Sequence, residues 1–156
     1  MKRWFNFARS KLDTIGLRFH YLRVGNTESI LDALKALTLD SEVEWDLIEI
    51  ESFNRLKLPT TFSEFSASII NLGIDDENVK EVRKQFWENY IWVTEDDPIP
   101  LALIIPDSNE PGSLTKSQVI ESLSLVRLND RPFEIFEFND DTSTQLMQWL
   151  LRLTAW

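Results

Sequence analysis

The stretch IPLALIIP, residues 99–106, is the longest apolar run of the chain and decides its fold class. A run of this length bounded by prolines is typical of a central strand that is buried on both faces of a sheet. It is far too short to span a bilayer, which takes about 20 apolar residues in a helix. We therefore expect a sheet whose middle is formed by this segment.

Alternation of apolar and polar residues predicts further strands on either side of this run. LRFHYLRV, residues 17–24, alternates, and FEIFEF, residues 133–138, is the most strand-like segment of the chain. EVEWDLIEIE, residues 42–51, also alternates, but its apolar phase slips at Leu47 and Ile48. This segment is therefore either a strand with a bulge or a helix, and we favour the strand.

Apolar residues spaced three or four apart predict helices over most of the remaining chain. Start and stop residues bound these helices: Thr27, Asp75 and Ser113 or Thr115 stand at cap positions, and Gly73 stands at an end. The predicted helices are residues 2–15, 28–39, 60–72, 76–90, 114–128 and 142–156.

This order of elements predicts a mixed α/β fold, with α+β as the alternative, in which helices flank a small central sheet of about four strands. The length of 156 residues predicts a single globular domain, 1–156. Within it, residues 1–16 are expected to form a basic amphipathic N-terminal helix, and residues 17–156 an acidic mixed α/β body.

Charge is distributed unevenly along the chain. Six of the 16 basic residues lie in the first 25 positions, where Asp13 is the only acid, whereas the rest of the sequence holds ten basic and 25 acidic residues. The net charge of −10 disfavours nucleic-acid binding by the body, because phosphate repels it. An anionic membrane or nucleic acid is therefore expected to bind only through the basic and aromatic residues 2–23.

Composition excludes several classes of site. The chain has no cysteine, so it has no disulfide, no thiolate metal site and no cysteine nucleophile. Its four glycines are scattered and none belongs to a glycine-rich phosphate-binding loop, so neither a P-loop nor a dinucleotide fingerprint is present. No apolar stretch of signal-peptide length follows the basic start, which predicts a cytoplasmic protein. No cofactor is expected.

Candidate catalytic residues are few. His20 is the single histidine, and we expect it to be an edge or surface side chain. Asp107 follows the central strand at the end where open sheets bind ligands, and Glu110 or Glu134 would have to converge with it to hold a divalent ion. Acidic residues at turns are explained by helix capping alone. We predict no catalytic and no metal-binding residue, with a divalent-metal hydrolase around Asp107 as the minor alternative.

Two tryptophan-bearing segments indicate a binding partner. The N-terminal segment interleaves cations with aromatic rings, and the C-terminal helix carries apolar residues on more than one face, which a homodimer through that helix would bury. The acidic body suits a protein partner, in particular a basic one. The predicted partner-binding residues are Lys2, Arg3, Trp4, Phe5, Arg9, Lys11, Asp96, Asp97, Trp149 and Trp156.

A short segment resembles the opening of SUKH-type domains. Residues 47–73 match it in having an acidic-apolar stretch, then Leu58-Pro59, then an aromatic-rich helix that ends near Asn71 and Gly73. The chain departs from the family pattern in having one glycine there instead of two. The resemblance implies an immunity or adaptor role in bacterial toxin systems and a helix at residues 43–54.

These observations together predict a non-enzymatic protein-interaction module, which would be an adaptor, an accessory subunit, or an inhibitor or immunity-type protein. It would use its acidic body and its exposed tryptophans. The principal alternative is a tether to a membrane surface or to nucleic acid through the N-terminal segment.

Overall fold

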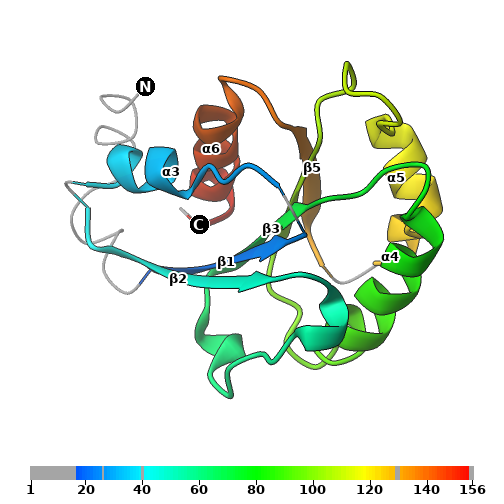
Figure 1. The fold of residues 1–156 in the computed structure, drawn as a ribbon. Helices are drawn as coiled ribbons and strands as arrows, with labels where there is room; N and C mark the ends of the chain where they lie inside the picture. Colours follow the sequence, from blue (N-terminus) through cyan, green and yellow to red (C-terminus); the bar gives the residue numbers. More distant parts are fainter. Residues whose placement is uncertain (1–16, 26, 40, 129–130, 155–156) are drawn as a thin grey trace.

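The computed structural model describes residues 17–25, 27–39, 41–128 and 131–154, and a five-stranded parallel sheet is its frame (Figure 1). The strand order is β2-β1-β3-β4-β5, and every neighbouring pair is parallel. The mixed α/β prediction is confirmed, although the sheet has five strands and not about four. The strands are β1 (Leu17–Val24), β2 (Val43–Ile50), β3 (Ala67–Leu72), β4 (Leu101–Ile105) and β5 (Phe133–Glu137).

Helices cover both faces of the sheet. The helices α3 (Leu31–Leu37) and α6 (Thr142–Thr154) lie on one face, and α4 (Val79–Phe86) and α5 (Lys116–Ser122) lie on the other (Figure 1). Within the described ranges no helix combines the length and the apolar character that crossing a membrane requires. The predicted helix at residues 2–15 lies outside the described residues. Short helical turns complete the chain: η1 (Phe53–Arg55), η2 (Phe62–Glu64), η3 (Trp87–Ile91) and η4 (Leu125–Arg127).

The third strand corrects the sequence analysis, which placed a helix at residues 60–72. The chain instead makes the short turn η2 and then enters β3, between β1 and β4. All six residues of β3 are buried, because both faces of this strand are covered. A strand buried on both faces has no polar alternation, so its isoleucines, together with Phe62 and Phe65, imitated the spacing of a helix.

Residues 42–51, whose apolar phase slips at Leu47 and Ile48, form the edge strand β2, so the strand that was favoured over a helix is confirmed. Its pairing with β1 runs without interruption from Leu17 and Val43 to Val24 and Ile50, so there is no bulge. Leu47 is 45% exposed, whereas Ile48 packs against the core. An edge strand tolerates such an exposed leucine. The helix that the SUKH-type resemblance implied at residues 43–54 is therefore wrong.

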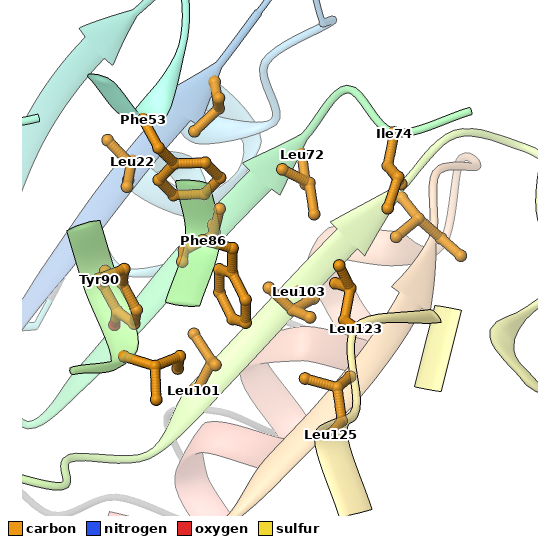
Figure 2. Packing of buried hydrophobic residues seen from close by; sticks show 14 of the residues in the cluster. Leu22, Phe53, Leu72, Ile74, Phe86, Tyr90, Leu101, Leu103, Leu123 and Leu125 are labelled. Carbon is orange, nitrogen blue, oxygen red and sulfur yellow. The ribbon is translucent and has the colours of Figure 1, made fainter. Parts of the chain in front are cut away.

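Two hydrophobic cores lie on the two faces of the sheet, and β4 contributes to both. Leu101, Leu103 and Ile105 enter the core beneath α4 and α5, part of which Figure 2 shows, whereas Ala102 and Ile104 enter the core beneath α3 and α6. This alternation confirms the prediction of a strand buried on both faces, made from IPLALIIP alone.

The cap of α5 confirms one of the two predicted alternatives. Thr115 accepts a hydrogen bond from the Gln118 backbone at 3.2 Å, and the Gln118 side chain accepts one from the Thr115 backbone at 2.8 Å. We expect Thr115→Ala to lower the free energy of unfolding by about 1 kcal/mol, because it leaves a helix N–H without an acceptor. Urea unfolding measures this loss. Thr115→Ser retains the acceptor and is expected to recover most of it; equal losses in both variants would contradict the capping role.

Candidate functional site

A cleft of about 620 Å³ lies at the carboxyl ends of β1, β3 and β4. The crossover after β1 carries α3 on one face of the sheet, and the crossover after β3 carries α4 on the other. The segments that follow β1 and β3 therefore leave the sheet toward opposite faces, and a crevice opens between them. In open α/β sheets with the strand order 2-1-3-4-5, ligands bind at this switch point between β1 and β3.

A buried hydrogen-bond network holds the loop after β1 at Glu28 and Ile30. The Asn71 side-chain nitrogen, Nδ2, donates to the Tyr21 hydroxyl at 2.9 Å and to the Glu28 carbonyl at 2.6 Å. The same hydroxyl accepts the Ile30 N–H at 3.1 Å. Asn71 and Tyr21 are both buried side chains of the sheet, and their hydrogen bonds hold the loop against it.

A backbone hydrogen bond joins the loops after β3 and β4. The Asp76 N–H donates to the Gly112 carbonyl at 3.0 Å. Gly112 has a φ of +77°, and a Cβ at this position would lie 3.0 Å from Asp76 Oδ1, so glycine is required there. Asn78 closes the first of these loops by donating to the Gly73 carbonyl at 2.8 Å. The walls of the cleft are thus built from loops with defined conformations.

Acidic side chains dominate the polar lining of the cleft, above an apolar floor. The floor includes Val24, Phe53 and Ile105, all of which are buried. No lysine or arginine occurs among the described residues that line the cleft. The carboxylates that line it are Glu28, Glu51, Asp75, Glu81, Asp107 and Glu110.

The loop after β1 lacks the sequence of a P-loop. Its sequence, GNTESI, has one glycine and no lysine, as the sequence analysis found. At the start of α3, the Ile30 N–H already donates to the Tyr21 hydroxyl and the Leu31 N–H to Ser29 Oγ, so neither is free to bind an anion.

Asp107 lies in the cleft, as its position after β4 predicted. Its carboxylate accepts the Asn109 N–H at 3.0 Å, and Glu110 lines the same cleft. Glu134, the other candidate partner, is not among the lining residues. In the described part of the chain, no three histidine, aspartate or glutamate side chains converge to hold a metal ion.

The predicted partner-binding residues that the structure describes do not line the cleft. Lys2, Arg3, Trp4, Phe5, Arg9, Lys11 and Trp156 lie outside the described residues. Asp96 and Asp97 are exposed in the turn after η3 and do not line the cleft.

Most of the described apolar residues of α6 are buried within the chain. Trp149 is 8% exposed and packs against Phe136, with ring centroids 6.1 Å apart. The sheet and α3 together cover two faces of this helix. The buried residues of α6 include Leu146, Met147, Leu150 and Leu151.

His20 is wholly buried, so the expectation of an edge or surface histidine is wrong. It stands on β1, which lies inside the sheet, and the rings of Phe62 and Phe65 meet it edge-on at 5.4 and 5.2 Å. Burial lowers the pKa of His20 to about 4, against the opposing charge of Asp46. The imidazole is therefore neutral at physiological pH, and it does not line the cleft.

Comparison with known proteins finds a solved structure of similar fold. No protein-family model matches the sequence, and no curated protein matches it. Among solved structures, the Arl6 BBS3 small GTPase from Trypanosoma brucei, which holds the nucleotide analogue GppNp, resembles this chain with a TM-score of 0.61 at 15% sequence identity. The match covers 88% of this chain and 98% of the GTPase. The chain thus has a GTPase-like α/β fold.

This likeness corrects the predicted function. The expectation of a non-enzymatic interaction module is contradicted, because the fold resembles that of a small GTPase. The sequence analysis also missed the residues that shape the cleft, among them Gly25, Asn71 and Asn78. The signal that would have located them is the end of β3, which was hidden by the helix predicted there.

Proposed function

We propose that the chain is a ligand-binding domain of GTPase-like fold whose cleft takes an organic amine with an apolar body, and that it does not hydrolyse GTP. The observation that carries this proposal is the lining of the cleft, in which six carboxylates face a cavity without a lysine or arginine among the described residues. Position and volume support a small ligand, since sites of 300–1,000 Å³ at switch points are typical of such binding.

Charge decides the class of ligand. Glu28, Glu51 and Glu110 form no ion pair with any described residue, so a cation in the cleft would meet unpaired carboxylates. A phosphate in the same place would meet repulsion, with no compensating cation from the described residues of the lining. The buried floor favours an apolar or aromatic group attached to the amine. The hydroxyl oxygen of Thr27, Oγ1, is buried without a hydrogen-bond partner and offers a polar contact within the cleft.

Thermal unfolding with matched ligands tests the proposal. Tryptamine and indole-3-acetate share an aromatic body but carry opposite charges. At 100 times its Kd, tryptamine is expected to stabilise the fold by about 2.7 kcal/mol and to raise Tm by about 5–10 °C. Indole-3-acetate and GTP with Mg²⁺ are expected to leave Tm unchanged. A rise in Tm with GTP and Mg²⁺, together with no rise with tryptamine, would overturn the proposal.

A pair of variants locates the binding site. Replacing Glu28 and Glu51 together by glutamine removes two charges from the cleft and is expected to weaken tryptamine binding at least tenfold. Replacing Glu95 and Glu121 by glutamine removes two charges from exposed positions elsewhere and is expected to have little effect. Equal weakening by the two pairs would show attraction to the whole acidic surface, and not to the cleft.

A further inference from the structure

Two faces of α4 border two cavities of opposite charge. Glu81, Val82 and Gln85 line the acidic cleft. Lys80, Arg83, Lys84 and Trp87, spaced three, one and three residues apart, line a second cavity of about 330 Å³. Residues at such spacings share one side of a helix. The second cavity, which we term the tryptophan groove, is completed by Glu88, Trp92 and Arg127.

The tryptophan groove concentrates positive charge in an acidic chain. It holds four of the twelve lysines and arginines in the described residues, against one acid, Glu88. None of the four forms an ion pair with a described carboxylate, and Arg83 donates instead to the Ser124 hydroxyl at 3.1 Å. Cations gathered without acidic partners repel one another, and an anionic ligand would relieve this repulsion.

The two indole rings supply an aromatic surface beside these cations. Trp87 is fixed in place, because its indole nitrogen, Nε1, donates to the Leu123 carbonyl at 2.6 Å and the Arg127 guanidinium lies 5.8 Å from its ring centroid. Trp92 lies 6.4 Å from Trp87 between ring centroids and is 57% exposed. A large aromatic side chain exposed to this extent provides a face on which a planar group can stack.

We propose that the tryptophan groove binds single-stranded nucleic acid, with a base stacked on Trp92 and phosphates held by Lys80, Lys84 and Arg127. Stacking rings beside a positively charged groove are the two components of such sites. An acidic peptide would use the cations but not the exposed indole face. A membrane surface would engage protruding side chains rather than a concave groove. This site is independent of the amine proposed for the acidic cleft.

Fluorescence anisotropy with a fluorescein-labelled 12-nucleotide oligo(dT) tests the proposal on the full chain at 50 mM KCl. Trp92→Ala is expected to weaken binding by about 5- to 150-fold, the effect of losing one stacked base. With three or four phosphates neutralised, the logarithm of the binding constant is expected to fall with the logarithm of salt concentration at a slope of about −2 to −3. Because Trp92 is largely exposed, its replacement is expected to leave the fold intact.

Two matched double variants distinguish binding at the groove from attraction to the charge of the whole chain. Lys80→Glu with Lys84→Glu is expected to weaken oligo(dT) binding more than tenfold. Lys57→Glu with Lys116→Glu changes the net charge equally at exposed positions outside the groove and is expected to weaken binding far less. The proposal is overturned if oligo(dT) does not bind, or if binding is insensitive to Trp92→Ala. It is also overturned if polyglutamate or phosphatidylserine vesicles bind through the groove residues and oligo(dT) does not.

Discussion

Replacing Phe86 by alanine is expected to lower the free energy of unfolding by about 3–5 kcal/mol. The Phe86 side chain on α4 is fully buried (Figure 2). Its ring stacks on Tyr90 with centroids 5.8 Å apart and meets Phe53 edge-on at 5.7 Å. Truncation removes this buried ring and leaves a cavity between α4 and the sheet, which the surrounding side chains fill only in part.

Urea unfolding followed by tryptophan fluorescence measures the effect of Phe86→Ala. Phe86→Leu keeps most of the apolar volume and is expected to cost less. Val126→Ala serves as the control, because Val126 is 74% exposed and its truncation is expected to change stability by less than about 0.5 kcal/mol. A loss below about 1 kcal/mol for Phe86→Ala would mean that this ring does not anchor α4 to the sheet.

Lowering the pH from 6.5 to 4 is expected to cost about 3 kcal/mol of stability through His20 alone. Burial among Phe62, Phe65 and the sheet lowers the pKa of His20 to about 4, from 6.5 in the unfolded chain. Each pKa unit corresponds to about 1.4 kcal/mol. Above pH 6.5 the imidazole is neutral in both states, so it adds no pH dependence.

The sign of the effect follows from which state takes up the proton. Between pH 6.5 and 4 the unfolded chain binds a proton that the folded chain excludes, so stability falls as the pH falls. Below pH 4 both states are protonated and the loss is complete. Unfolding free energies at several pH values, for the natural chain and for His20→Gln, isolate this contribution, because the carboxylates titrate in both. Parallel curves across this window would contradict a buried neutral imidazole.

The candidate site was predictable from the sequence only at Asp107 and the nearby Glu110. Asp107 follows the one strand whose burial on both faces was evident, so its place at the carboxyl edge of the sheet could be stated. Asn71 lies near the carboxyl end of a strand of the same kind, but Phe62, Phe65 and Ile69 happen to lie at helical spacing, and the strand was assigned as a helix. With that strand missing, the crevice between β1 and β3 could not be anticipated.

The tryptophan groove was equally beyond the sequence analysis. Lys80, Arg83, Lys84 and Trp87 are close in sequence, but Arg127 reaches them only because η4 packs beside α4. Net charge gave the opposite expectation for this part of the chain, because a sum over residues does not record which cations share a surface. The location of these charges depends on the packing of α5 and α4 against the same face of the sheet.

The elements whose signal is local follow from the sequence. Residues within a few positions of each other indicate strands β1, β4 and β5, favour a strand over a helix for β2, and narrow the cap of α5 to Ser113 or Thr115. Tertiary structure alone decided the strand β3, the burial of His20 and the separation of an acidic cleft from a basic groove by α4. These depend on neighbours distant in the chain, because burial, pKa and surface charge are set by what packs around a residue and not by its own type.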